Sequence, residues 1–286
     1  MTIATEPALR AGPRGQDGRL SIHAALIGGR TRLLSLRSQA PLQVLRAAYT
    51  EPEVPGLAAV TICSPAGGVL QGDRLGIEVA LDANAQLRLE TQSATRLYTM
   101  PDSSAFGSVT LKVGPGAYLE YVPDPLIPYA GAAYRQESTW DVDESATLIA
   151  GEVVTAGREA RGERARYQRV ELEIDARRPG GQMLFSDSCV LVPDDDHQLG
   201  FLGGHTTLGS LFVVSSTFRA AAFVAFTEHP AVAAGYAGWS DLPNHAGAWF
   251  KVLAHDSATA VGAVQAAWQA ARRAILGANL PPKRRF

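Results

Sequence analysis

Apolar and polar residues alternate along much of this chain, in short segments that turns separate. Every second residue is apolar in four segments: residues 75–81, 87–90, 109–113 and 169–175. A period of two is typical of a β-strand with one face against the core and the other in water. Residues 82–85 and 114–116 carry turn-forming Asn, Asp, Gly or Pro, and residues 184–192 and 211–215 are further strand candidates. The pattern therefore predicts many short strands joined by turns.

One strong helix is predicted near the C-terminus. Its apolar residues recur at spacings of three and four: Val261, Val264, Trp268, Ala271 and Ile275. Asp256, Ser257 or Thr259 is expected to cap its start, and Gly277 suits the position just past its end. A weaker helical stretch covers residues 230–236. We therefore predict a mainly β fold with one or two helices late in the chain.

The strand and turn rhythm continues from about residue 21 to residue 216, with no tandem repeat and no long linker. We therefore predict one extended β domain at 21–277, which includes a helix at about 257–276. Residues 1–20 are expected to form a flexible tail, and residues 278–286, with Lys283-Arg284-Arg285, a basic tail. A chain of 286 residues buries enough surface to fold without disulfides.

Composition excludes several classes of protein. Hydrophobic residues make up 46% of the chain and the net charge is −2, which excludes wholesale disorder and a basic nucleic-acid binder. No run reaches the roughly 18 apolar residues of a membrane span, and the N-terminus has no apolar signal segment, so we expect a cytoplasmic protein without membrane contact. The two cysteines, Cys63 and Cys189, exclude a disulfide framework and a Cys-rich zinc site.

The familiar catalytic motifs are absent, and the histidines are scattered. The best metal-like cluster is Asp194-Asp195-Asp196-His197, with His205 eight residues further on. Carboxylates with an imidazole bind divalent ions, although an acidic surface loop explains the same residues.

Several polar residues interrupt strands that are otherwise apolar. Thr91, Ser93 and Thr95 alternate along one segment, which predicts three hydroxyls on one strand face. Glu152 and Asp187 lie within apolar runs, and Asp73 follows Gly72 in a turn. A carboxylate in such a place either is paired locally, with Arg74, Arg96 and Arg158 as candidate partners, or lines a wet cavity.

Five stretches, in order, resemble a known family. Ser64-Pro-Ala-Gly-Gly-Val-Leu-Gln-Gly-Asp-Arg-Leu75 resembles a stretch built around Pro-x-Gly-Gly-x-x-x-Gly-Asp in the UreD (UreH) urease accessory proteins. Thr91-Gln-Ser-Ala-Thr-Arg-Leu-Tyr98 and Tyr121-Val-Pro-Asp-Pro-Leu-Ile-Pro-Tyr129 resemble two more. Residues 151–163 and 239–253 complete the order, so the resemblance covers about residues 21–286.

This resemblance implies a β-superhelix, similar to a β-helix, with two helices. It implies a non-catalytic scaffold for urease maturation, which binds apo-urease and a UreF-like protein that recruits the UreG-like GTPase. Nickel(II) is expected to pass transiently through a polar tunnel, with no tightly bound cofactor. Inward-facing Thr91, Ser93 and Thr95, with Asp73, Glu152 and Asp187, are the residues in this sequence that would line such a path.

A second surface is predicted near the C-terminus. Four aromatic residues lie close in sequence and suit either a local core or a partner-binding surface: Trp239, Trp249, Phe250 and Trp268. The resemblance implies that a UreF-like partner contacts this end. Two other hypotheses stay open: a β-helical carbohydrate-active lyase or hydrolase with paired acids such as Asp73 and Glu152, and a plain β scaffold without metal traffic.

Overall fold

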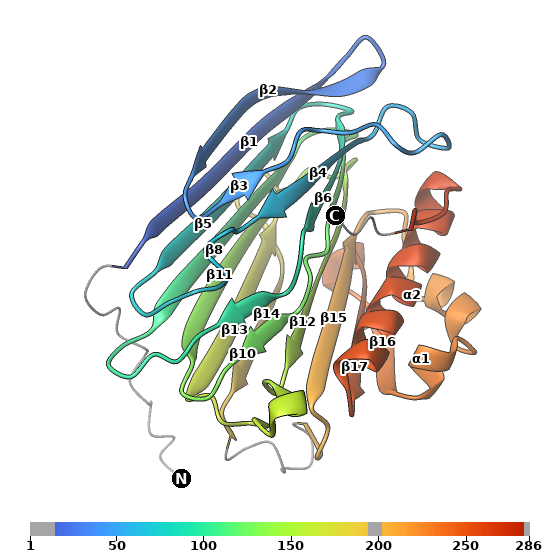
Figure 1. Cartoon of the computed structure of the whole chain (residues 1–286). Helices are drawn as coiled ribbons and strands as arrows, with labels where there is room; N and C mark the ends of the chain where they lie inside the picture. The colour runs from blue at the N-terminus through green and yellow to red at the C-terminus, as the bar shows by residue number, and fades with distance from the viewer. Residues whose placement is uncertain (1–14, 194–201, 283–286) are drawn as a thin grey trace.

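The strands form two sheets that face each other (Figure 1). The structure is a computed structural model and describes residues 15–193 and 202–282. The seven-stranded sheet has the order β14-β13-β11-β8-β5-β1-β2. Its strands are β1 (Asp17–Ile27), β2 (Arg30–Gln39), β5 (Arg74–Leu81), β8 (Ala105–Val113), β11 (Ala133–Val142), β13 (Arg169–Arg177) and β14 (Met183–Leu191).

The second sheet has ten strands, eight of them in the order β16-β17-β15-β12-β9-β6-β4-β3. They are β3 (Gln43–Val44), β4 (Ala58–Cys63), β6 (Gln86–Thr91), β9 (Tyr118–Tyr121), β12 (Thr147–Thr155), β15 (Thr207–Val214), β16 (Tyr236–Asp241) and β17 (Gly247–Ala254). The short strands β7 (Thr95–Leu97) and β10 (Leu126–Pro128) complete it, with β10 paired to both β12 and β7.

From β4 to β13 the chain passes back and forth between the sheets. Strands β4, β6, β9 and β12 are parallel neighbours in one sheet, while β5, β8, β11 and β13 are parallel neighbours in the other. This winding is the arrangement of a β-solenoid, so the predicted β-superhelix is confirmed. Strand β1 begins at Asp17, so residues 17–20 belong to the first strand and not to a flexible tail as the sequence suggested.

The helices cover the outer face of the ten-stranded sheet (Figure 1). They are α1 (Pro230–Ala233) and α2 (Ser257–Leu276), with the 3₁₀ turn η3 (Ala220–Phe226), while the 3₁₀ turns η1 (Glu159–Arg161) and η4 (Pro243–His245) lie outside this layer. Asp256 caps α2 by accepting the Thr259 N–H at 2.8 Å, and Gly277 ends it with a φ of 67°, as predicted. The second predicted helix is only α1, because residues 234–236 leave the helix. No helix in the described part of the chain combines the length and apolar character of a membrane span.

Hydrophobic cores form on both faces of the ten-stranded sheet. Between the sheets, Trp140, Phe185 and Phe212 pack together, with Phe185 and Phe212 stacked at 5.4 Å between ring centroids. Outside the ten-stranded sheet, Phe250 on β17 and Trp268 on α2 belong to a separate core beneath the helix. The ten-stranded sheet therefore buries residues on both of its faces.

A buried cluster of charges attaches α2 to the sheet. The guanidinium of Arg272 is fully buried and donates two hydrogen bonds to the carboxylate of Glu120 on β9, at 2.7 and 3.0 Å. Arg272 also pairs with Glu51, and Glu51 lies 3.2 Å from the guanidinium of Arg88 on β6. Because each carboxylate faces a guanidinium, the helix can bury these charges, and its place over the sheet is fixed.

We expect Arg272→Met to destabilise the fold by about 3–5 kcal/mol, because Glu120 would keep a buried charge without its main partner. Arg273→Met, at the exposed neighbouring position, is the matched control and should change stability by less than about 1 kcal/mol. Urea unfolding followed by circular dichroism measures both. Equal effects of the two substitutions would show that the cluster does not hold the helix.

Candidate functional site

One level of the space between the sheets is polar, and the levels on both sides are apolar. The first apolar row across the ten-stranded sheet is Val60, Leu89, Tyr121, Ala150, Phe212 and Trp249. The next inward-facing row is Ile62, Thr91, Glu152, Ser210 and Lys251. The third is Leu126, Val154, Leu208 and Leu253. A polar layer therefore crosses an interior that would otherwise be dry.

The seven-stranded sheet supplies polar groups to the same region. On β11, Gln136 and Ser138 take two successive inward-facing positions, and on β14 Cys189 and Asp187 lie level with them. These residues share rows with Leu172 and Ile174 of β13, whose side chains are buried in the core. The polar layer is thus built from both sheets and extends toward the edge formed by β14.

The ten-stranded sheet has a gap at this level, because β9 ends at Tyr121. Residues 122–125, Val-Pro-Asp-Pro, leave the strand ladder, and pairing to β12 resumes only at Leu126. The two prolines have no backbone N–H to donate, so they interrupt a central strand. The loop is held from the β6 side: the Asp124 N–H donates to the Thr91 hydroxyl at 2.7 Å, and that hydroxyl donates to the Asp124 carboxylate at 3.2 Å.

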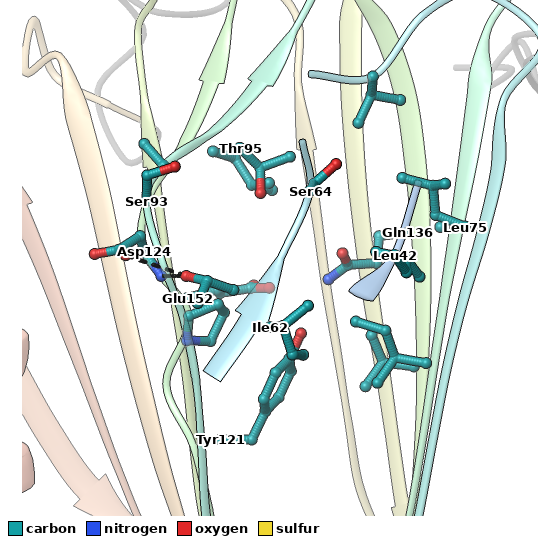
Figure 2. Close-up of a pocket in the computed structure, with 18 of the residues that line it drawn as sticks. Leu42, Ile62, Ser64, Leu75, Ser93, Thr95, Tyr121, Asp124, Gln136 and Glu152 are labelled. Carbon is teal, nitrogen blue, oxygen red and sulfur yellow. Dashed lines mark hydrogen bonds between the residues drawn. The ribbon is translucent and has the colours of Figure 1, made fainter. Parts of the chain in front are cut away.

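A cavity of about 250 Å³ occupies the polar layer beside this gap. Thr91, Ser93, Thr95 and Glu152 line it, so the structure brings together four of the six residues proposed for a polar path (Figure 2). The expected single strand is interrupted, since β6 ends at Thr91 and β7 starts at Thr95. Ser93 lies in the bend between them and is exposed, which places the mouth of the cavity there.

The stretches that carry the family resemblance converge on this cavity. Its lining includes residues from 64–69, 91–96, 121–126 and 150–153. Gln136 lies on the opposite wall from Glu152 (Figure 2). These stretches lie in separate turns of the solenoid, and the fold brings them together around one cavity.

The cavity meets a second hollow on the other side of the ten-stranded sheet. This groove, of about 1010 Å³, runs beneath α2 and η3. Three residues line both spaces: Pro123, Asp124 and Val153. Arg88 and Glu90 also line the groove. The Pro-Asp-Pro loop is therefore the partition between an inner polar cavity and an outer groove.

The electrostatics of the cavity centre on Glu152. Burial, and to a lesser extent the Asp187 carboxylate, raise the pKa of its carboxyl to about 7, and the Lys251 ammonium partly offsets this increase. Burial, with the Glu152 charge, also raises the pKa of the Tyr121 and Tyr134 phenols, so both stay protonated and can donate hydrogen bonds. Burial and Glu152 raise the pKa of the Cys189 thiol to about 12, which keeps it a poor metal ligand at neutral pH.

Asp187 and Asp73 do not line the cavity. Asp187 forms an ion pair of 2.6 Å with Lys251 at the edge of the polar layer. Asp73 is buried in the turn before β5, where its carboxylate accepts the backbone N–H groups of Gln16 and Leu70, both at 2.8 Å. Asp73 is therefore held by hydrogen bonds, the first of the two interpretations considered for these acids, and it does not line a wet cavity. The paired acids of the lyase or hydrolase hypothesis, Asp73 and Glu152, therefore do not face a common groove.

The candidate partners of these acids also differ from expectation. Arg158 pairs with Glu163, with Nε to Oε2 at 2.8 Å, and lies over the ring of Tyr129. The cation that pairs with Asp187 is Lys251, which was not among the predicted partners.

The four C-terminal aromatics do not form one surface. Phe250 is 0% and Trp268 6% exposed, which makes both core residues beneath α2. Trp239 is partly exposed on β16 and stacks on Phe250, while Trp249 faces the other core, between the sheets. Partner contact through Trp239 or Trp249 stays a prediction.

The metal-like cluster Asp194–His197 lies outside the described residues. His205, its predicted companion, stacks on His255 with 4.5 Å between ring centroids and bonds to the Leu202 carbonyl. Within residues 15–193 and 202–282, no three His, Cys, Asp or Glu side chains are grouped so that they could hold a metal ion. Within these ranges the oxygen donors described above therefore do not close into a metal cage.

Sequence reasoning missed Asp124 and Lys251 as parts of the site. Asp124 stands within a stretch that carried the resemblance, and its place between two prolines was a signal that it leaves the sheet. Lys251 lies between Phe250 and Val252 in an apolar strand, the same kind of signal that singled out Glu152.

Fold and site together define a β-solenoid protein with a polar cavity between its two sheets. Comparison with known proteins gives the family. A model of the UreD urease accessory protein family matches residues 16–285. The chain therefore belongs to the UreD family, which gives it a role in urease maturation.

Relatives across bacteria and archaea agree with this assignment. The chain is 36% identical over 291 residues to urease accessory protein UreD 2 of Streptomyces griseus subsp. griseus, covering 99% of both chains. It is 36% identical over 258 residues to UreD 2 of Brucella suis biovar 1, covering 88% of this chain and 85% of that one. UreD of Cenarchaeum symbiosum is 32% identical over 278 residues, covering 96% and 97%.

The raised pKa of Glu152 predicts a pH-dependent cost to stability. The usual pKa of a glutamate carboxyl is 4.5, and that of Glu152 in the folded protein is about 7. Between these two pH values the folded protein keeps the proton of Glu152, whereas the unfolded chain has lost it. The stability that the neutral group provides is therefore lost as the pH rises through about 7. Glu152→Gln should gain stability relative to the unchanged protein between pH 5 and pH 8, on the order of 2 kcal/mol.

Chemical denaturation at both pH values measures this difference. Glu144→Gln, at an exposed position in a turn, is the control and should show no such change between pH 5 and pH 8. A Glu152→Gln difference that is the same at both pH values would mean that Glu152 has an ordinary pKa.

Proposed function

We propose that this protein is a non-catalytic scaffold that binds apo-urease and UreF-like and UreG-like accessory proteins, and that it passes nickel(II) toward the urease active site. The observation that carries the proposal is that an inner polar cavity and an outer groove lie on the two sides of Asp124, in a member of the UreD family. The cytoplasm is the proposed location, since urease maturation requires contact with newly made urease.

The chemistry of the layer suits a metal ion in transit. A divalent ion cannot cross a dry β core, because removing its water is too costly. Thr91, Asp124 and Glu152 offer oxygen atoms that can replace part of the hydration shell along the cavity. Oxygen donors hold nickel less tightly than imidazole or thiolate, and a site that must release its ion benefits from weak, successive contacts.

The groove beneath α2 fits the expected contact with a UreF-like partner. Its walls are mainly apolar and include Phe226 of η3, Val261 and Trp268 of α2, and Leu280. Arg88, Glu90 and Asp124 place charges on its floor. A partner seated in this groove would lie against the Pro-Asp-Pro loop, where an ion could enter the cavity.

The path is tested by urease activation in a host that lacks this gene. Glu152→Leu should lower nickel-dependent urease activity at least about tenfold, because a loss of about 1.4 kcal/mol in interaction with the passing ion slows passage by that factor. Urease activity at limiting and at added nickel gives the measurement, with the amount of folded protein checked by immunoblot and circular dichroism.

Glu144→Leu removes an exposed carboxylate outside the cavity and should activate urease normally. Full activation by Glu152→Leu would exclude Glu152 from the path. Full urease activity in the host without this gene would contradict the maturation role itself.

The groove is tested by partner capture. Val261→Arg places a charged side chain in the apolar groove and should abolish co-purification with a co-expressed UreF-like protein, because a buried unpaired charge opposes docking. Val224→Arg, at a position of η3 that is 59% exposed and does not line the groove, should leave co-purification unchanged. Equal capture of both variants would show that the UreF-like partner does not bind in this groove.

A further inference from the structure

The ion pair of Asp187 and Lys251 closes the polar layer at the edge of the sandwich. Asp187 lies on β14, the edge strand of the seven-stranded sheet, and Lys251 lies on β17 of the other sheet. Their Oδ1 and Nζ atoms are 2.6 Å apart, and the side chains are 24% and 32% exposed. Water therefore reaches this pair from outside, on a side of the molecule away from the Pro-Asp-Pro loop.

The ammonium also belongs to the row that contains Glu152. Glu152, Ser210 and Lys251 are direct partners across β12, β15 and β17, and their side chains share the inward face. The ammonium lies 5.9 Å from the ring centroid of Phe212, one level below. Two carboxylates, Glu152 and Asp187, thus share one fixed cation, and the charges of all three influence one another.

We propose that Lys251 is a tethered cation that occupies the Asp187 end of the path and competes there with a divalent metal ion. This inference rests on the proposed nickel path and adds a group that lowers the affinity of the path for the metal ion. A metal ion that arrives at Asp187 displaces the ammonium, which moves toward solvent along its flexible chain. When the ion leaves, the ammonium returns to the carboxylate.

The charges explain why such a device is useful. Without Lys251, the Asp187 carboxylate has no cation beside it, and it attracts and retains divalent ions together with the oxygen atoms of Glu152 in the same layer. With Lys251 the charge of Asp187 is neutralised, and every metal ion bound there has a competitor that never diffuses away. The result is a weak binding site from which a metal ion dissociates readily, as transport requires.

Metal titration of the purified protein tests the proposal. Isothermal titration with NiCl₂ should show at least about tenfold tighter binding for Lys251→Met than for the unchanged protein, since the competitor is gone while the carboxylates remain. Lys251→Arg keeps the positive charge and should bind as weakly as the unchanged protein. Adding Asp187→Asn to Lys251→Met should remove the gain.

Lys112→Met is the matched control, because Lys112 is an exposed residue of β8 outside the polar layer, and it should not change nickel affinity. Unchanged affinity in a folded Lys251→Met protein would overturn the proposal and make the ion pair a simple link between the sheets. A gain that survives Asp187→Asn would overturn it as well. The readout does not involve urease, so failure here leaves the maturation role standing, and failure of activation by the Glu152 variant leaves the Lys251 result standing.

Discussion

The polar cavity between the sheets exists because one strand ends early. Strand β9 stops at Tyr121, and Pro123 and Pro125 prevent the chain from continuing the ladder between β6 and β12. One level of the sheet therefore loses its central strand, and Thr91 and Glu152 face a cavity where the neighbouring levels are packed with apolar side chains. Asp124 fills the opening and reaches both sides of the sheet. A complete β9 would give an ordinary dry sandwich with no connection between its interior and the groove.

The same sheet must also carry a helix on its outer face, and this requirement explains the buried charges there. Glu120 of β9 points outward, away from the cavity, and meets the buried guanidinium of Arg272. Because successive side chains of β9 point to opposite faces of the sheet, the strand contacts both cores. Tyr121 completes the apolar row between the sheets, and Glu120 pairs with Arg272 of α2 on the outer face. Because α2 is held at this strand, its apolar side and the Pro-Asp-Pro loop form walls of one groove.

Much of the fold was predictable, because the information lies in local periodicity. The alternation at residues 75–81 and 169–175 predicts β5 and β13, and the spacing of Val261, Trp268 and Ile275 predicts α2. The hydroxyls at positions 91, 93 and 95 do share a cavity, although a bend separates them. Side-chain pairing was not predictable in the same way. Asp73 and Asp187 look alike in sequence, yet Asp73 accepts backbone N–H groups from its own turn and from Gln16, whereas Asp187 meets Lys251, 64 residues away in the second sheet.

The unequal environments of the carboxylates explain how a β core can be polar without becoming a metal cage. Asp124 is bonded to the hydroxyl of Thr91, Asp187 is paired with Lys251, and Glu152 lies in a buried position that raises the pKa of its carboxyl to about 7. The partners of Asp124 and Asp187, and the proton that Glu152 keeps, lower the cost of holding these acids inside the fold. The same features weaken each acid as a ligand. The same partners that stabilise these acids in the fold are thus the ones that would weaken their hold on a cation under the proposed nickel transfer.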